Sequence, residues 1–259
     1  LEVLRVLKEE CIPHPHLNII FTVGEEIGLL GAKNLLKKYL KADFGYTLDG
    51  GEVREIINRA PSQRSLEAEI IGRAAHAGVH PEEGINAIKV ASLAISKMRL
   101  GRIDKETTAN IGIIKGGIAT NIIPERVELK GEARSHRTSK LRRQISHMER
   151  ELSKACRHFK ARLKLKVTPS YNSFDIGKKE KVLEIAVAQA KRLGMKPSVK
   201  ETGGGSDANI FNEYGIPTII LGVGAEAVHT KQERIDLDDM VRASELLLEI
   251  IKEACLEKL

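Results

Sequence analysis

The order of apolar and polar residues in the first quarter of the chain is typical of α/β units. Residues 18–23 are apolar on both faces, as expected of a strand inside a parallel sheet that helices cover. Residues 27–39 repeat their apolar side chains at helical spacing and predict an amphipathic helix. A second short strand is predicted at residues 46–48, and both strands end at acidic residues.

From residue 65 the pattern changes to that of a separate α+β domain. The predicted order is strand, helix, strand, strand, helix, strand, with a turn that contains Gly and Pro between the second and third strands. This order predicts a ferredoxin-like two-layer sandwich, in which two helices cover four antiparallel strands. The predicted elements are strands at 65–75, 108–115, 126–135 and 162–171, and helices at 86–98 and 139–159.

Beyond residue 173 the α/β pattern returns. A helix is predicted at residues 179–193, a buried strand at 216–221 and a terminal helix at 236–259. The simplest organisation is one α/β domain that is interrupted by an inserted α+β domain. The predicted boundaries give a first part at residues 1–64, the inserted domain at 65–172 and a second part at 173–259.

The composition then limits the class of protein to which the chain can belong. Of the 259 residues, 42% are hydrophobic and 30% are charged, a balance typical of a folded globular chain. Four Tyr, five Phe and no Trp leave the core to Leu, Ile, Val and Ala. No apolar run approaches the roughly 20 residues of a transmembrane helix, so we expect no membrane span. Three widely spaced cysteines favour a reducing cytoplasm over a disulfide framework or a cysteine zinc site.

The net charge of +7 is concentrated in one segment. Residues 139–166 carry ten Lys or Arg and two Glu. Such a segment binds nucleic acid in some proteins, and in others it is a solvated helix followed by an edge strand that lysines protect from pairing. Phe159 is the only Phe, Tyr or Trp in the segment, so it offers no stacking platform for single strands. We therefore expect no nucleic-acid partner.

Acidic and imidazole side chains follow three of the predicted strands. Glu25 and Glu26 come directly after the first strand, at the edge where open α/β sheets build their sites. Asp49 ends the next strand, and His229 follows the strand at 216–221. Each also has a plain structural explanation, because acidic pairs favour helix N-termini, Asp-Gly is common in turns, and single histidines are common at surfaces. Together they form an oxygen and imidazole set that suits Zn²⁺, Mn²⁺ or Co²⁺.

The glycine-rich segment at residues 202–207 has two possible readings. It could bind an anion, but it lacks the lysine and the spacing of a phosphate-binding loop. Ser206 is not part of a nucleophile elbow, because Ala208 stands where that motif requires glycine. Spacing alone therefore predicts a plain turn.

Seven motifs, in order along nearly the whole chain, resemble those of the M20 metallopeptidases. Within this family the chain is most similar to the tripeptide aminopeptidase (peptidase T) branch. The resemblance implies a zinc-peptidase-like catalytic domain, with a mixed sheet and helices on both faces, interrupted by a lid or dimerisation domain. It also implies two divalent metal ions, a short-peptide substrate and a homodimer formed through the lid. The matching motifs lie at residues 21–32, 47–51, 72–78, 116–125, 131–134, 203–208 and 229–230.

The resemblance assigns roles to residues of the predicted catalytic domain. Glu25 would be the general base that takes a proton from the attacking water. Glu26 and His229 would be ligands of one metal ion, and Asp49 would be a ligand of the other. Gly204 would lie along the backbone of the substrate.

It also assigns roles to residues of the predicted lid. His76 would stabilise the developing oxyanion, and in many relatives it does so across a dimer. Asn121 and Arg134 would bind the peptide, with Arg134 as a fork for its carboxylate.

Two departures from the family pattern affect the expected activity. The chain begins with a predicted helix, in which Leu1, Val3, Leu4 and Leu7 follow helical spacing. The family also uses a His and a metal-bridging Asp upstream of this helix, and neither has a candidate here. Leu1 has no preceding residue that could cap this helix, so we expect an N-terminally incomplete chain. We expect this 259-residue species to bind metal weakly and to have little hydrolytic activity.

Two other functions stay open on the sequence. An M20-type N-acyl amino acid deacylase or carboxypeptidase would fit as well, because Arg134 could hold a free carboxylate in either enzyme. The chain could also be a non-catalytic dimerising module that keeps the fold.

Overall fold

The structure of the chain is a computed structural model that describes residues 1–256 and contains two compact units. Unit 1 consists of residues 1–60 together with the chain from residue 174 onward, and unit 2 is Pro61–Ser173. The chain leaves unit 1 and returns to it at neighbouring points, because Ala60 is paired with Phe174. Unit 2 is therefore an insertion within unit 1.

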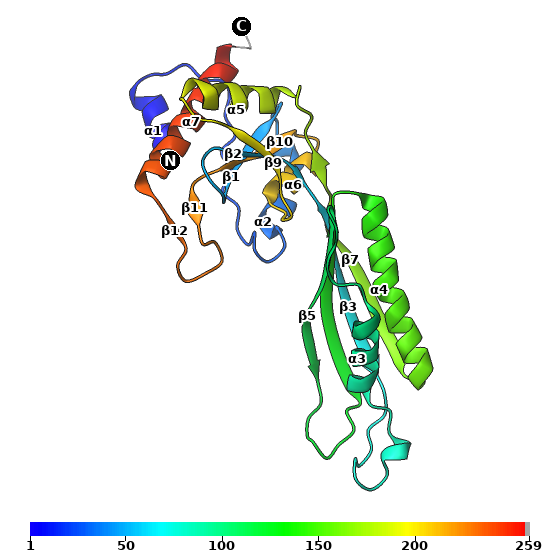
Figure 1. Cartoon of the computed structure of the whole chain (residues 1–259). Helices are drawn as coiled ribbons and strands as arrows, with labels where there is room; N and C mark the ends of the chain where they lie inside the picture. The colour runs from blue at the N-terminus through cyan, green and yellow to red at the C-terminus, as the bar shows by residue number, and fades with distance from the viewer. Residues whose placement is uncertain (257–259) are drawn as a thin grey trace. The chain divides into compact units, whose positions relative to one another are not determined.

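Unit 1 is built on a mixed five-stranded sheet (Figure 1). β1 (Gly45–Asp49) runs parallel to β10 (Thr218–Gly222), which is antiparallel to β2 (Glu55–Ala60). β2 also pairs with β8 (Phe174–Asp175) and β9 (Ser198–Glu201). Every residue of β10 is buried, as expected for a strand that is covered on both faces. A separate two-stranded ribbon joins β11 (Ala225–Glu226) and β12 (Arg234–Ile235).

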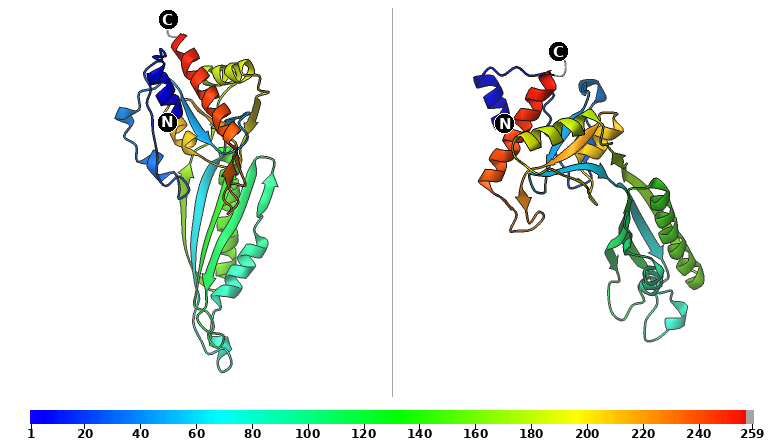
Figure 2. Two further views of the ribbon diagram at one scale, coloured as in Figure 1. Left: turned by 90° about the vertical axis from the view of Figure 1, so that its left-hand side faces the viewer. Right: turned by 45° about the horizontal axis from the view of Figure 1, so that its top comes forward.

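Helices lie on both sides of this sheet (Figures 1 and 2). α5 and α7 pack against each other, and α6 packs against β10 and β1. Their apolar faces share one core with the strands, to which Ile185, Ala208 and Leu246 contribute from the three helices. The helices of unit 1 are α1 (Glu2–Glu9), α2 (Leu30–Lys33), the 3₁₀ turn η1 (Lys37–Tyr39), α5 (Lys181–Arg192), α6 (Asp207–Glu213) and α7 (Leu237–Leu256).

The strand predicted at residues 18–23 does not form, so that prediction is wrong. This segment belongs to no sheet, and the side chains of Phe21 and Val23 are 76% and 77% exposed. A strand that is apolar on both faces is stable only between neighbouring strands and under helices. β1 pairs with β10 alone, and no described segment pairs with the other edge of β1.

The helix predicted at residues 27–39 is also mostly wrong. Only α2 and η1 form there, because Gly28 and Leu29 both have positive φ angles of 106° and 59°. A left-handed residue cannot continue a right-handed helix. Sequence spacing did not reveal this interruption, since the apolar period continues through it.

Unit 2 is a single antiparallel sheet in the order β4-β5-β6-β3-β7. The inner strands β3 (Ser62–Ile71) and β6 (Arg126–Ser135) pair along their full length, with Ser62 opposite Ser135 and Ile71 opposite Arg126. β7 (Arg162–Tyr171) covers the outer edge of β3. β5 (Thr107–Gly116) lies beyond β6, and the short β4 (Gly101–Asp104) covers only one end of β5.

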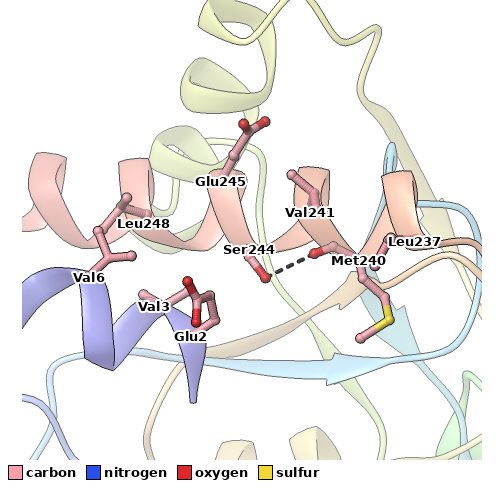
Figure 3. A pocket seen from close by; sticks show the side chains of 9 residues that line it. All are labelled: Glu2, Val3, Val6, Leu237, Met240, Val241, Ser244, Glu245 and Leu248. Carbon is pink, nitrogen blue, oxygen red and sulfur yellow. Dashed lines mark hydrogen bonds between the residues drawn. The ribbon is translucent and has the colours of Figure 1, made fainter.

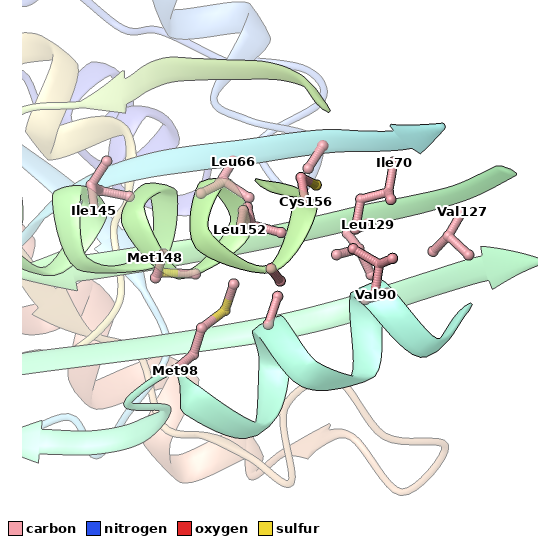
Figure 4. Packing of buried hydrophobic residues seen from close by; sticks show 14 of the residues in the cluster. Leu66, Ile70, Val90, Met98, Val127, Leu129, Ile145, Met148, Leu152 and Cys156 are labelled. Atoms are coloured by element: carbon pink, nitrogen blue, oxygen red, sulfur yellow. The ribbon is translucent and has the colours of Figure 1, made fainter. Parts of the chain in front are cut away.

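Two helices cover one face of this sheet (Figure 4). They are α3 (Ala87–Lys97) and α4 (Thr138–Phe159), and the turn η2 (Pro81–Glu83) precedes α3. Leu129, Met148 and Leu152 are fully buried between the layers. The predicted ferredoxin-like arrangement is confirmed, with β4 as a fifth strand that the pattern did not predict. Within residues 1–256, no helix is long and apolar enough to cross a membrane.

The core of unit 2 gives a stability prediction. Ile70 is fully buried in the β3 layer, whereas Ile118 in the same unit is 87% exposed. We expect Ile70→Ala to lower the free energy of unfolding by about 2–5 kcal/mol, because it removes buried methyl groups and leaves a cavity. The matched variant Ile118→Ala should change it by less than about 0.5 kcal/mol. Urea unfolding followed by far-UV circular dichroism measures both, and equal losses would contradict the assignment of this core.

Candidate active site

The parallel pairing of β1 with β10 places two candidate residues at one edge of the sheet. Asp49 is paired with Gly222, so the loops that follow both strands leave in the same direction. Gly222 packs so closely that a Cβ atom there would lie 2.1 Å from the carbonyl oxygen of Glu52. The Gly224 N–H donates to the carbonyl of Gly51 over 2.8 Å and joins the two loops. The longer of these loops carries His229.

The loop with Glu25 and Glu26 is folded by short-range backbone hydrogen bonds. The N–H groups of Gly28 and Leu29 donate to the Glu25 carbonyl over 3.0 and 2.8 Å. The Gly31 N–H donates to the Val23 carbonyl over 2.8 Å and closes the loop. The result is a compact turn that carries Glu25 and Glu26.

The acidic loop meets His229 at this edge. The Nδ1 atom of His229 lies 3.5 Å from Oε1 of Glu26, and both side chains are 71% exposed. Burial, together with the negative charges of Asp49, Glu26 and Asp207, raises the pKa of Glu25 to about 7, while His229 opposes the shift. Three of the predicted residues, Glu26, Asp49 and His229, therefore lie within electrostatic reach of Glu25.

The chemistry of this group fits a divalent cation. Carboxylate oxygens and an imidazole nitrogen are the donors that zinc, cobalt and manganese accept. A cation would also relieve the repulsion that raises the pKa of Glu25. Within residues 1–256, however, no three His, Cys, Asp or Glu side chains lie close enough to hold one ion. The metal roles of Glu26, Asp49 and His229 thus stay predictions.

Gly204 lies in the turn between β9 and α6. Its N–H donates to Oγ1 of Thr202 over 3.1 Å. The turn ends in a capping box, in which Ser206 accepts from the Ala208 N–H and its own N–H donates to Oδ1 of Asn209. The glycine-rich segment is therefore a turn that starts a helix.

Sequence reasoning missed Asp207 as a member of the acidic group. Its Oδ2 atom accepts a hydrogen bond from Thr22, and its Oδ1 atom is buried without a hydrogen-bond partner among the described residues. A carboxylate directly after a glycine-rich turn was visible in the sequence. Its contact with a residue 185 positions away was not.

In unit 2, His76 and Asn121 are neighbours. His76 forms an isolated bridge with Ile122, and the Ala77 N–H donates to the carbonyl of Asn121 over 2.9 Å. Nδ1 of His76 accepts from the Gly78 N–H over 3.2 Å. The side chains of His76, which follows β3, and of Asn121, which precedes β6, are both exposed.

Arg134 lies at the other end of the same sheet. It is one residue from the Ser135 end of β6, whereas His76 and Asn121 lie beyond the Arg126 end. Strands of this length span about 30 Å, so one unit 2 does not bring Arg134 together with His76. Nε of Arg134 donates to Glu132 over 2.8 Å, and Glu132 also accepts from Gln63. The guanidinium is thereby fixed in orientation.

A groove of about 360 Å³ lies elsewhere in unit 1, between α1 and α7 (Figure 3). None of the candidate residues lines it. Its lining is mostly apolar and comprises Glu2, Val3, Val6, Leu237, Met240, Val241, Ser244, Glu245 and Leu248.

Comparison with known families and proteins shows what this chain is similar to. Residues 62–160 match the model of the M20 peptidase dimerisation domain, and residues 175–246 match that of the M42 glutamyl aminopeptidases. The chain is 44% identical over 254 residues to the uncharacterized protein YqjE of Bacillus subtilis, covering 98% of this chain and 68% of YqjE. It is 26% identical to peptidase T of Haemophilus influenzae, covering 96% of this chain. It spans only 61% of that relative's length.

A solved structure gives the same result. The crystal structure of a tripeptidase from Staphylococcus aureus superposes with a TM-score of 0.94 at 43% identity, over 98% of this chain and 68% of that one. Together with the dimerisation domain in unit 2, these likenesses show that the chain belongs to the M20 peptidases, in the peptidase T branch.

Proposed function

We propose that this chain belongs to an enzyme that hydrolyses peptide bonds in short peptides, as an aminopeptidase or tripeptidase. The observation that carries the proposal is the meeting of three chain segments at one sheet edge. The loop with Glu25 and Glu26, the end of β1 at Asp49 and the loop with His229 converge there, and the Glu26 and His229 side chains lie 3.5 Å apart. The relatives named peptidase T and tripeptidase support the same activity.

In this proposal Glu25 is the general base. Its carboxylate would accept a proton from the attacking water and return it to the departing amine. Glu26 and His229 would hold one divalent ion and Asp49 a second, with zinc, cobalt or manganese as the candidates. Such ions, when bound, supply Lewis-acid activation of water and stabilisation of negative charge.

The other predicted residues would bind the peptide. Gly204 would accommodate its backbone, Arg134 would pair with its carboxylate, and Asn121 would donate hydrogen bonds. His76 would stabilise the oxyanion. Because Arg134 and His76 lie at opposite ends of one sheet, we propose that His76 and Asn121 serve the site of a second copy in a homodimer.

A second copy is supported by an open strand edge in unit 2. β4 covers β5 only at residues 107–109, so the outer edge of residues 110–116 has no partner among the described strands. Ile113 and Ile114 are 43% and 52% exposed along this edge. Exposed apolar edges with free N–H and C=O groups are templates for pairing with another strand.

Two alternatives have an observation in their favour. An N-acyl amino acid deacylase or carboxypeptidase would use the fixed Arg134 guanidinium on a free carboxylate in the same way. A non-catalytic dimerising module agrees with the absence of a three-ligand group within residues 1–256.

The three free cysteines, Cys11, Cys156 and Cys255, support a reducing cytoplasm as the proposed compartment.

The decisive experiment supplies the part of the enzyme that this chain does not span. The 259 residues would be fused to the segment of the S. aureus tripeptidase that they do not cover, and both proteins would be assayed with Co²⁺. We expect the fusion to release the N-terminal residue from tripeptides and the 259 residues alone to show little activity. Glu25→Gln in the fusion should lower kcat by about 10²–10⁴-fold, because it removes the base.

The control is His14→Ala, an exposed histidine outside the proposed site, which should leave kcat unchanged. An inactive fusion, or a Glu25→Gln variant with full activity, would refute the enzyme proposal. Faster hydrolysis of N-acetyl amino acids, or release of the C-terminal residue first, would favour the deacylase or carboxypeptidase.

The raised pKa of Glu25 gives a pH prediction for the metal-free chain. A carboxyl group whose pKa is higher in the folded state stabilises the fold at low pH, and this contribution is lost as the pH rises through about 7. Glu25→Gln mimics the neutral form, so in EDTA its stability relative to the parent should grow between about pH 5 and pH 8. The gain should reach about 1–2 kcal/mol, less than the full shift implies because the group is partly exposed.

Urea unfolding at each pH measures the difference. The comparison variant is Glu69→Gln. The hydrogen bond from Lys164 lowers the pKa of the Glu69 carboxyl group, so its charged form stabilises the fold. Glu69→Gln should therefore lower the free energy of unfolding relative to the parent above neutral pH, opposite in sign to Glu25→Gln. A Glu25→Gln curve parallel to the parent's at every pH would contradict the environment described for Glu25.

The open edge of β5 gives a prediction about assembly. Ile114→Lys places a charge on the proposed pairing edge and should weaken dimerisation about tenfold or more. Val199→Lys, at a similarly exposed position on β9 of unit 1, should not change it. Sedimentation velocity over a concentration series measures the dimer constant, and a monomeric parent or equal effects of both variants would exclude this interface.

A further inference from the structure

Helix α6 holds the acidic loop at two points. Asp207 is the first residue of α6, and its carboxylate accepts a hydrogen bond from Oγ1 of Thr22, which lies just before the loop. At its C-cap, the Tyr214 hydroxyl lies 3.1 and 3.0 Å from the carbonyls of Ala32 and Lys33, just after the loop. Both contacts join residues more than 180 positions apart in sequence.

The helix is a rigid support for these contacts. Its capping box fixes Ser206 and Asn209, which are both buried, and Ala208 and Ile210 are buried in the core of unit 1. α6 also packs directly against β10 and β1, the two strands that set the edge of the sheet. A group fixed to α6 is therefore fixed relative to Asp49.

The loop itself has little else to hold it. Phe21, Val23 and Ile27 are mostly exposed, and residues 12–22 belong to no sheet. Its own hydrogen bonds reach only from one residue to another within 23–31. Leu29 and Ala32 are its buried apolar anchors, and both come after the two carboxylates. Before Glu25, Val23 is bonded only within the loop, and the contact between Thr22 and Asp207 joins this segment to α6.

The charge of Asp207 is costly at this place. It adds to the negative field around Glu25, and one of its oxygens is buried without a hydrogen-bond partner among residues 1–256. An unsatisfied buried acceptor and like-charge repulsion both disfavour a carboxylate. The hydrogen bond from Thr22 and the position in the first turn of α6, where the helix dipole favours a carboxylate, offset part of these penalties.

We propose that Asp207 is a positioning residue, which with Tyr214 clamps the loop so that Glu25 and Glu26 face Asp49 and His229. Its role in catalysis rests on the proposed function, but the clamp itself does not. Asp207 acts through Thr22 and is not proposed to touch the substrate.

Amide hydrogen exchange tests the clamp on the 259-residue chain without metal. The amides of Gly28, Leu29, Leu30 and Gly31 report on the loop, because each donates to a carbonyl within it. Thr22→Val keeps the shape of the side chain but removes the donor, and should speed their exchange about tenfold or more. Thr22→Ser keeps the hydroxyl and should restore the parent rate. Asp207→Ala should match Thr22→Val, and Asp207→Asn, which keeps an acceptor oxygen, should resemble the parent.

The amides of β10 distinguish a local effect from a global one. They should exchange as in the parent in every variant, because β10 is buried between the helices. Tyr214→Phe should also speed exchange in the loop, and the control Tyr39→Phe, at an exposed ring, should not. Unchanged loop rates in Thr22→Val, or an equal rise in β10, would overturn the clamp.

A Co²⁺ titration separates the clamp from the proposed function. If the clamp positions metal ligands, Asp207→Ala should weaken Co²⁺ binding about tenfold or more, and Asp207→Asn should retain it. Equal Co²⁺ affinity in Asp207→Ala and the parent would overturn the positioning role. A parent chain without measurable Co²⁺ affinity would agree with the weak metal binding expected of these 259 residues, and the exchange rates would then decide the clamp.

Discussion

The pairing of β1 with β10 is the interaction on which the candidate site depends. It joins Gly45–Asp49 to Thr218–Gly222, two segments that are separated in sequence by the whole of unit 2. Because the strands are parallel, the loops that carry Asp49 and His229 leave at one edge. The close packing of Gly222 against the backbone of Glu52 leaves no room for a side chain in this register. The candidate site therefore depends on this pairing, and a shift in the register of β1 against β10 would separate its residues.

The site gathers negative charge at a cost. Burial and the negative charges of Asp49, Glu26 and Asp207 together raise the pKa of Glu25. Such repulsion is tolerated when protons or cations balance it. The distant contacts of α6 oppose the tendency of the carboxylates to separate. Structure and chemistry at this edge are therefore linked.

Unit 2 is inserted with little disturbance of unit 1. The chain departs after Ala60 and returns at Phe174, and these residues are paired across β2 and β8. At the base of unit 2, the Ser173 N–H donates to Oγ of Ser62 over 2.7 Å and closes the insertion. The long antiparallel sheet then separates its two ends, with Arg134 at one and His76 with Asn121 at the other. The proposed homodimer would use these two ends and the open strand edge of β5.

The sequence by itself determined the elements whose burial has a simple period. Helices α3, α4, α5 and α7 and strands β5, β6 and β7 each have one apolar face, and local spacing is enough to predict them. It also indicated Asp49 at the end of β1 and His229 after β10, whereas it placed Glu25 and Glu26 after a strand that does not form. Tertiary structure decided the rest. Residues 18–23 have the pattern of a buried strand, but neighbouring strands and covering helices decide whether such a strand forms. Asp207 joined the site through Thr22, a contact across 185 residues that no local pattern contains.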